Sequence, residues 1–266
     1  MWTLKVAILV ILVVLTLFVV GGTMYGHHNL FQPTDRIYYE PDAHYREFFL
    51  KGVYGRYFDN FPGQKTVLYC HGNNANLTSR KYIIDLCNRG GINLLLFDYQ
   101  GYGKSSGSPY QYSIQPDAQT AYDYLIGTGV VPENIVVWGE SLGGNPATFL
   151  AESNPISCLI LLSTFSSMGE TFSDYGWNYL HKVIEMSFDP ADTVSRLKNV
   201  KCPVIVIHST EDEMIPFKGA ERLYSAINHK NKKLVQMSGP HGNPSIEPAT
   251  LDQLIKYFKT GNLNWQ

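Results

Sequence analysis

Ile135-Val136-Val137-Trp138-Gly139-Glu140-Ser141-Leu142-Gly143-Gly144-Asn145 is the stretch from which the architecture can be worked out. An apolar, β-branched run ends at a glycine, a serine follows, and a helical pattern continues from Pro146 to Glu152. The spacing G-x-S-x-G in a strand–turn–helix context predicts a nucleophile elbow, in which a strained turn lifts a serine hydroxyl clear of a sheet. The flanking glycines fit this turn, because a side chain there would collide with the neighbouring strand or helix. The alternative is an ordinary glycine-rich loop.

The composition indicates a globular protein. The chain has 266 residues, of which 44% are hydrophobic and 17% are charged, so it is long enough for one large α/β domain or two small ones. A formal net charge of −2 leaves no electrostatic footprint for nucleic acid, and we expect no nucleic-acid partner. The four cysteines form no C-x-x-C pair, so they do not indicate a zinc or redox site and are expected to be buried free thiols.

Short apolar runs alternate with helical patterns along most of the chain. The runs are nearly all apolar, as expected for parallel strands buried on both faces. They are Thr66–Cys70, Ile92–Phe97, Ile135–Trp138, Ile156–Leu162, Val204–Ile207 and Leu234–Met237. The helical stretches are Ser79–Asn88, Gln115–Ile126, Pro146–Glu152, Phe217–Ile227 and Ala249–Phe258. With an antiparallel hairpin over Tyr45–Leu50 and Tyr54–Phe58, the pattern predicts a doubly wound, mostly parallel α/β sheet.

One long segment, Ser166–Val200, interrupts the alternation and is rich in aromatic side chains. Because it lies between two core strands, we expect it to form a small helical lid over the carboxyl edge of the sheet. Its Trp177 and Tyr179, together with Met214 further along the chain, are the predicted substrate-binding residues. The alternative is an enlarged crossover helix whose aromatic side chains only pack the segment onto the core.

The amino-terminal stretch is apolar and uncharged for about the length of a membrane span. Val6–Val20 is apolar except for Thr16, and no charge appears again until Asp35. We therefore expect a transmembrane anchor over residues 1–25, followed by a catalytic domain over residues 26–266. One lysine and the amino terminus precede the stretch, which favours a single-pass membrane protein with its catalytic domain on the non-cytosolic side. The alternative is a signal peptide cleaved near Gly21.

A serine hydroxyl is a weak nucleophile and needs a base. Of the eight histidines, His71 and His208 end core strands and are expected to have structural roles. His241 lies in Ser238–Asn243, a stretch of small residues after the last strand that we call the histidine loop. The chain order serine, acid, histidine requires a late histidine, so His241 is the predicted base.

The acid that orients His241 is ambiguous from spacing alone. The stretch Ser209–Pro216, which we call the acid loop, carries three adjacent carboxylates, Glu211, Asp212 and Glu213. Two of the three are expected to be solvated surface charges. Two backbone N–H groups must also stabilise the developing oxyanion, and the predicted donors are those of Leu142 and Asn73.

The chain resembles the α/β-hydrolases, and within them the membrane-anchored alpha/beta hydrolase domain-containing proteins. Five motifs occur in the order seen in that superfamily: Cys70–Asn73, Phe97–Ser105, Gly139–Gly144, His208–Pro216 and Gly239–His241. The resemblance covers roughly Thr66 to the end. It implies that Asp212 is the acid, that Ser141, Asp212 and His241 form the triad, and that neither a metal nor an organic cofactor is needed. Gln100 and Ser209 depart from the usual Arg and Gly.

These observations predict a serine hydrolase that cleaves carboxylic esters or thioesters through an acyl-enzyme, with lipid or fatty-acyl substrates at a membrane. A serine peptidase is the alternative enzyme, and a non-catalytic binding protein with the same fold is the alternative of another class. The oligomeric state stays open. Asn76-Leu77-Thr78 forms a glycosylation sequon just after the predicted oxyanion loop, and we expect it to be unoccupied or directed away from the site.

Overall fold

The computed structural model describes residues 30–177, 193–243 and 245–260. The chain divides into two compact units, Met1–Gln32 and Pro33–Gln266, and the description below concerns the second. The predicted anchor, residues 1–25, lies outside the described ranges. Among the helices of these ranges, none combines the length and apolar character that a bilayer crossing requires.

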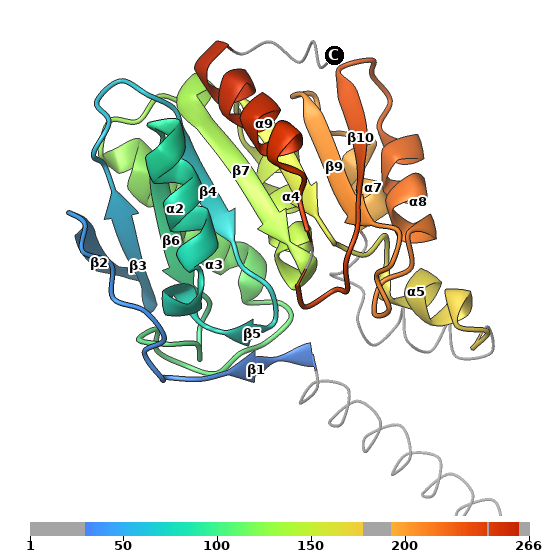
Figure 1. The fold of residues 1–266 in the computed structure, drawn as a ribbon. Helices are drawn as coiled ribbons and strands as arrows, with labels where there is room; N and C mark the ends of the chain where they lie inside the picture. Colours follow the sequence, from blue (N-terminus) through green and yellow to red (C-terminus); the bar gives the residue numbers. More distant parts are fainter. Residues whose placement is uncertain (1–29, 178–192, 244, 261–266) are drawn as a thin grey trace, which may run out of the picture. The chain divides into compact units, whose positions relative to one another are not determined.

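An eight-stranded sheet forms the centre of the unit (Figure 1), with the strand order β10-β9-β8-β7-β4-β6-β3-β2. The six strands from β10 to β6 pair in parallel, and the β2–β3 hairpin adds two antiparallel strands at one edge. The strands are β2 (Arg46–Leu50), β3 (Val53–Phe58), β4 (Thr66–Cys70), β6 (Asn93–Asp98), β7 (Ile135–Glu140), β8 (Cys158–Leu162), β9 (Val204–Ser209) and β10 (Lys232–Met237). Two further strands, β1 (Gln32–Pro33) and β5 (Asn74–Ala75), have two residues each.

Helices cover both faces of the sheet (Figure 1). α2 (Lys81–Gly90) and α9 (Pro248–Thr260) lie on one face. On the other, α3 (Ile114–Gly127), α4 (Gly144–Ser153), α7 (Thr193–Leu197) and α8 (Lys218–Ala226) pack in succession against one another. Strands β4, β7, β8 and β9 are buried throughout or nearly so, because helices exclude water from both of their faces.

The predicted mostly parallel α/β sheet is confirmed. Each predicted strand and helix is present, and the differences are confined to the ends. β7, for example, runs two residues beyond the predicted Trp138, because Gly139 and Glu140 continue the ladder opposite Leu161 and Leu162. Apolar patterning does not reveal a strand end whose backbone pairing continues through a glycine and a charged residue.

The predicted lid is described in part. It contains α5 (Met168–Asp174) and α7, and residues 178–192 between them lie outside the described ranges. Arg222 of α8 forms an ion pair with Asp174 and donates to the Ser166 hydroxyl over 3.1 Å. The side chain of Asp174 is 7% exposed, so this pair fixes the beginning of the segment to the neighbouring helix.

Candidate active site

The turn between β7 and α4 has the geometry of the predicted elbow. Ser141 begins the short 3₁₀ helix η3 (Ser141–Gly143) and has a φ of 51°, a left-handed value that is strained for a side-chain-bearing residue. A Cβ on Gly139 would lie 2.5 Å from the Gly143 carbonyl oxygen, and one on Gly143 would lie 1.9 Å from that of Cys70. The two flanking glycines are therefore required by close approach, as the sequence predicted.

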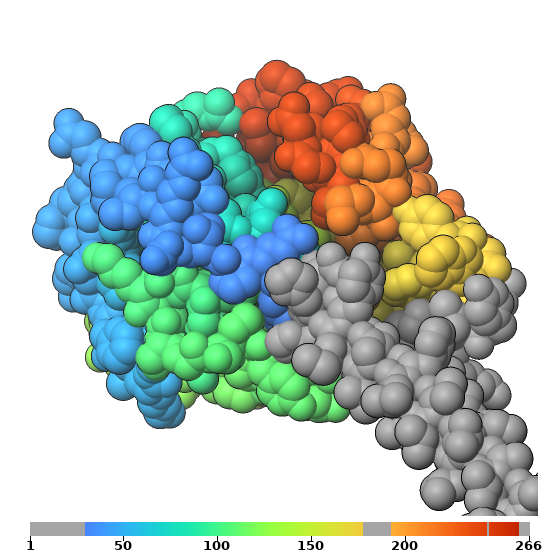
Figure 2. Space-filling model, turned by 90° about the horizontal axis from the view of Figure 1, so that it is seen from below, coloured from blue at the N-terminus to red at the C-terminus, as the bar shows by residue number. Residues whose placement is uncertain are grey.

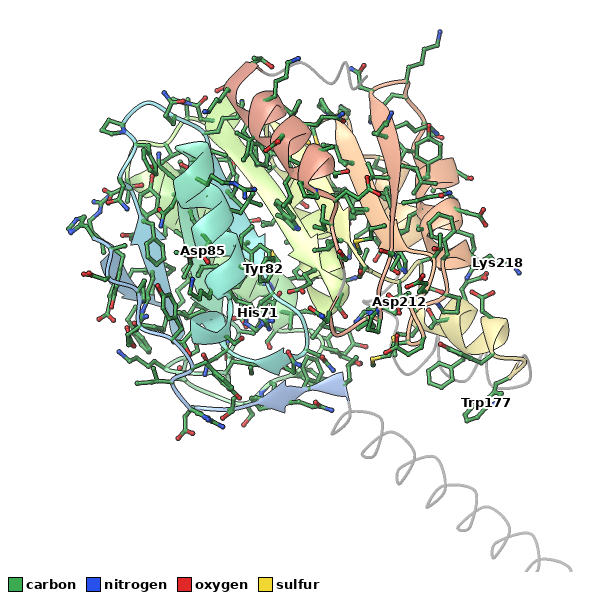
Figure 3. All side chains as sticks on the ribbon, in the orientation of Figure 1. His71, Tyr82, Asp85, Trp177, Asp212 and Lys218 are labelled. Carbon is green, nitrogen blue, oxygen red and sulfur yellow. The ribbon has the colours of Figure 1, made fainter. Side chains whose placement is uncertain are left out.

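The structure brings the three predicted catalytic side chains together from three separate connections, and Asp212 is labelled in Figure 3. The Ser141 Oγ lies 3.0 Å from Nε2 of His241. On the other side of the ring, Nδ1 of His241 lies 2.8 Å from Oδ2 of Asp212. Because Nδ1–H donates to the carboxylate, Nε2 is the ring atom free to accept the serine proton.

Asp212 is held by more than its bond to His241. Its Oδ1 accepts the N–H groups of Met214, over 2.9 Å, and Ile215, over 2.7 Å. Burial raises the pKa of this carboxyl, but hydrogen bonds from His208, His241 and the Ile215 N–H outweigh burial and hold it well below its usual range. Asp212 is therefore ionised and fixed in direction at neutral pH.

His208 contacts Asp212 and the backbone of the acid loop. Its Nε2 lies 2.8 Å from the Ile215 carbonyl oxygen and 3.3 Å from Oδ2 of Asp212, and its side chain is fully buried. The sequence analysis gave this residue a structural role without identifying what it supports. Its spacing of four residues before Asp212, at the end of a core strand, is the signal that indicates the pairing.

The electrostatics around His241 favour its charged form. Burial lowers the pKa of the imidazole, whereas the hydrogen bond to Asp212 and the charges of Asp212, Glu140 and Glu213 raise it, and the net effect is a raised pKa. Such surroundings stabilise the imidazolium that forms when the ring takes a proton from Ser141.

The loop after β4 carries the predicted oxyanion donor Asn73 and lies beside Ser141. A Cβ on Gly72 would be 3.5 Å from the Ser141 Cβ, and nothing else meets it more closely. The hydroxyl of Tyr102 donates to the Asn73 carbonyl over 2.7 Å, and that of Tyr99 donates to the His71 carbonyl over 3.0 Å. Leu142, whose N–H is the other predicted donor, is buried next to the serine.

Asp98 and His71 both have structural roles. Oδ1 of Asp98 accepts the Leu77 N–H over 2.7 Å and lies 3.5 Å from Nε2 of His71. The Asp98 carbonyl accepts the Ser105 hydroxyl over 2.6 Å, which holds the turn after β6. Asp98 therefore braces loops next to the site, while Asp212 is the carboxylate that reaches His241.

The predicted substrate-binding residues are described in part. Trp177 (labelled in Figure 3) and Met214 are 49% and 55% exposed, and Tyr179 lies outside the described residues. The Trp177 ring packs against Phe172 of α5 with centroids 5.8 Å apart. The hydroxyl of Tyr175 donates to the Glu213 carbonyl over 2.5 Å and so connects the lid segment to the acid loop.

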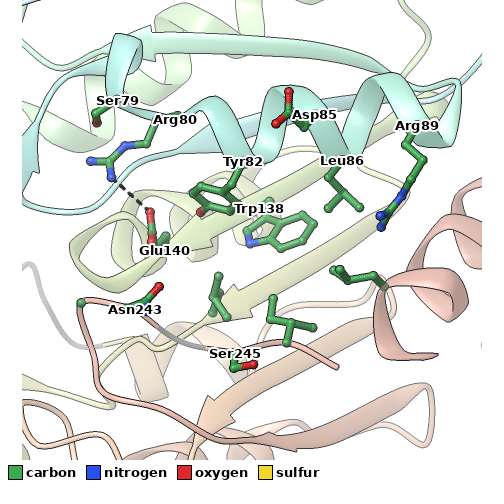
Figure 4. A pocket seen from close by; sticks show the side chains of 14 residues that line it. Ser79, Arg80, Tyr82, Asp85, Leu86, Arg89, Trp138, Glu140, Asn243 and Ser245 are labelled. Carbon is green, nitrogen blue, oxygen red and sulfur yellow. Dashed lines mark ion pairs between the residues drawn. The ribbon is translucent and has the colours of Figure 1, made fainter. Parts of the chain in front are cut away.

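A pocket of about 680 Å³ lies beside the elbow, between α2, β7 and the end of the histidine loop (Figure 4). Trp138, Leu86 and Glu140 are among the residues that line it. The Glu140 carboxylate accepts the Tyr69 hydroxyl over 2.6 Å and lies 3.6 Å from a guanidinium nitrogen of Arg80. Glu140, the residue before Ser141, is thus held by a partly buried polar network.

The sequon asparagine points into the protein. Asn76 is 2% exposed, and its Nδ2 donates to the carbonyls of Thr34 and Arg36 over 2.8 and 2.9 Å. A glycan on Nδ2 would replace one of its two donor hydrogens and so break at least one of these bonds, and attachment would require the buried side chain to turn outward. The geometry agrees with the expectation of an unoccupied sequon.

Comparison with known proteins agrees with this arrangement. Residues 100–245 match the prolyl oligopeptidase family. An uncharacterized protein of Mycobacterium tuberculosis is 32% identical over 196 residues, covering 72% of this chain and 69% of the relative. Alpha/beta hydrolase domain-containing protein 17C of Homo sapiens is 31% identical over 196 residues, covering 73% of this chain and 57% of the relative.

Among solved structures, an esterase of Pyrococcus furiosus superposes with a TM-score of 0.70 at 19% identity, covering 86% of this chain and 97% of the esterase. That likeness establishes the fold. The family match extends over more than half of the 266 residues and includes the elbow, the acid loop and His241. The chain is an α/β-hydrolase that belongs to the prolyl oligopeptidase family.

Proposed function

We propose that the protein is a serine hydrolase that cleaves carboxylic esters or thioesters through an acyl-enzyme. Ser141 attacks the acyl carbonyl while His241 accepts its proton, and the N–H groups of Leu142 and Asn73 stabilise the oxyanion. His241 then returns the proton to the leaving group. Water, activated by the same imidazole, resolves the acyl-enzyme and releases the acid.

The hydrogen-bonded chain from Ser141 through His241 to Asp212 carries this proposal. A non-catalytic binding protein has no need to hold a serine at a strained φ of 51°, nor to keep a carboxylate ionised behind a histidine. Backbone strain at one residue and a strongly lowered carboxyl pKa nearby are together typical of a reactive site.

Replacing the nucleophile tests the proposal. Ser141→Ala should reduce hydrolysis of short p-nitrophenyl esters to background and abolish labelling by a fluorophosphonate probe, because the attacking oxygen is removed. Both are measured on the purified full chain, with Ser163→Ala as the matched control, since Ser163 is a buried serine at the end of β8. Labelling that persists in Ser141→Ala would refute the assignment.

For the substrate, we propose fatty-acyl esters or thioesters presented at a lipid surface. The support is an apolar rim on the carboxyl edge of the sheet, the side seen in Figure 2. Within residues 30–177, 193–243 and 245–260, exposed large hydrophobic side chains lie in connections at this edge or bonded to them: Ile37, Tyr38, Tyr110, Tyr112, Tyr175, Trp177 and Met214. Tyrosine and tryptophan favour membrane interfaces.

The proposed membrane attachment rests on the apolar sequence from Val6 to Val20, with the catalytic domain on the non-cytosolic side. The full-length protein should stay in the membrane fraction after alkaline carbonate extraction, because a spanning segment is not released by removing peripheral contacts. Amino-terminal sequencing of the native protein distinguishes the alternative. A chain that begins near Thr23 would show that a signal peptide is cleaved.

A peptidase is the second candidate, and the family match is the observation that favours it. The same three side chains cleave amides as well as esters, so the geometry of the serine and its partners does not separate the two activities. Parallel kcat/KM measurements on acyl esters and on matched peptide amides do separate them. A preference for the amide would replace the lipid proposal while leaving the roles of the three residues intact.

A further inference from the structure

We propose that Glu211 and Glu213 are positioning residues, which hold the histidine loop in register with the acid loop by accepting its backbone N–H groups. The inference rests on the proposed serine hydrolase function. The sequence analysis expected both side chains to be solvated surface charges. Both residues are exposed, as expected, and the structure in addition directs each carboxylate at the loop that carries His241.

Three consecutive acidic side chains of the acid loop bind N–H groups of the histidine loop. One Glu211 carboxylate oxygen accepts the Gly239 N–H over 2.8 Å, and one Glu213 oxygen accepts the N–H of His241 itself over 2.9 Å. Between them in sequence, Asp212 takes the imidazole Nδ1–H over 2.8 Å. Three successive carboxylates of the acid loop therefore each bind a different N–H of a three-residue stretch.

Ser209 adds a fourth connection. Its hydroxyl donates to the Gly239 carbonyl over 2.5 Å and accepts the Glu211 N–H over 3.0 Å. The N–H and the carbonyl of Gly239 are thus both bound by the acid loop. Ser209 is one of the departures from the family pattern. A glycine at position 209 would have no hydroxyl to make either bond.

Within the described residues, the other backbone bonds of the histidine loop do not connect its tip to the acid loop. Asn243 N–H donates to the Pro240 carbonyl within the loop, and Ser245 N–H donates to the Ser238 carbonyl at its base. Neither bond fixes His241 relative to Asp212. A shift of the ring by about 1 Å is enough to cost a large factor in rate, so the Glu211 and Glu213 bonds act on catalysis through His241.

The two glutamates differ in their expected effect on the pKa of His241. This difference gives a readout that a loss of folding stability alone would not change. The ionisable groups that raise the pKa of His241 are Asp212, Glu140 and Glu213, against burial, which lowers it. Activity requires neutral His241, so the acid limb of kcat/KM follows its pKa. Removing the Glu213 charge should lower that pKa and move the acid limb to lower pH, whereas the Glu211 charge is not among the largest contributions.

The experiment measures kcat and the pH profile of kcat/KM for a soluble p-nitrophenyl ester with the full chain. Glu211→Ala and Glu213→Ala should each lower kcat about tenfold. The Gln variants should recover most of the loss, because the amide oxygen accepts the same N–H. The acid limb should move to lower pH in both Glu213 variants and stay in place in both Glu211 variants.

Glu221→Ala is the matched control, since Glu221 is an exposed carboxylate on the adjacent α8. It should change neither kcat nor the pH profile. Folded Ala variants with wild-type kcat, or an unmoved acid limb in Glu213→Gln, would overturn the inference. If an Ala variant does not fold, Glu211→Asp and Glu213→Gln decide, the first through lowered kcat and the second through the limb.

Fluorophosphonate labelling of the wild-type protein separates failure of this inference from failure of the proposed function. An unlabelled wild-type protein would contradict the serine hydrolase itself. A labelled wild-type protein whose glutamate variants react at the same rate and show the same pH profile would contradict only the positioning role.

Discussion

At the scale of single residues, the geometry of Asp212 explains why one of three adjacent carboxylates can orient His241. Its Oδ1 is fully used by the N–H groups of Met214 and Ile215, which leaves Oδ2 aimed at the imidazole. Glu211 and Glu213 have an additional methylene, and their carboxylates accept backbone N–H groups of the histidine loop. The division of roles follows from side-chain length and the turn of the loop.

Asp212→Asn should lower kcat by about 10⁴-fold while the protein stays folded, because an amide NH₂ facing Nδ1 favours the wrong imidazole tautomer. Hydrolysis of a soluble ester, with circular dichroism as the check of folding, measures this. Glu213→Gln, the same chemical change one residue later, should cost at most a few-fold. Equal losses in the two variants would show that the acid has been misassigned.

The sequence alone could not separate these three carboxylates. Their spacing is compatible with each one reaching His241, and only the resemblance to a family favoured Asp212. Which backbone N–H a flexible glutamate accepts depends on how two loops, 28 residues apart in the chain, meet in space. Periodicity and composition contain no information about that meeting, so the bonds from Glu211 and Glu213 were missed.

At the scale of secondary-structure elements, the sequence was far more informative. Strands buried on both faces must be apolar throughout, and the helices between them repeat apolar residues with the helical period. The order of strands and helices can therefore be predicted from the hydrophobic pattern of the sequence. The exceptions are element ends such as Glu140, where backbone pairing continues through polar residues. The elbow is a case in which single residues report element packing. Its glycines are required because α4 packs closely against β7 and β4.

Gly143→Ala should destabilise the fold by about 3 kcal/mol or more, because the new Cβ would lie 1.9 Å from the Cys70 carbonyl oxygen, a backbone atom that can move only with β4. Thermal unfolding followed by circular dichroism measures the change. Gly127→Ala is the control: nothing lies within 4 Å of a Cβ at this helical position, and alanine favours helix there. A Gly143→Ala protein as stable as this control would contradict the packing described for the elbow.

At the scale of the whole molecule, the apolar rim and the point where the chain enters the folded unit lie at the same edge. Thr34 accepts hydrogen bonds through its carbonyl from Asn76 and Gly103, both in loops at the carboxyl ends of strands β4 and β6. The apolar sequence ending at Val20 is fourteen residues upstream, a reach of at most about 50 Å. A linker of this length would let the catalytic edge reach the bilayer if the proposed anchor spans it.

The rim can be tested without touching the proposed site. Replacing Ile37, Tyr38, Tyr110 and Tyr112 with serine should lower hydrolysis of a long-chain ester carried in phosphatidylcholine vesicles about tenfold or more, because apolar side chains that enter the interface are lost. Hydrolysis of a soluble short-chain ester should be unchanged, since the bonds that join Ser141, His241 and Asp212 are made without these four side chains.

The matched control replaces Ile126 and Val131, which are also apolar and exposed but lie at the end of α3 and in the turn before β7, at the opposite edge of the sheet. If general loss of surface hydrophobicity were responsible, the control would lose vesicle activity as well. If docking through the catalytic edge is responsible, the control keeps it, because only the rim faces the surface that presents the acyl chain. Equal vesicle activity in the rim variant and the wild type would rule out the lipid-facing role while leaving the serine hydrolase chemistry intact.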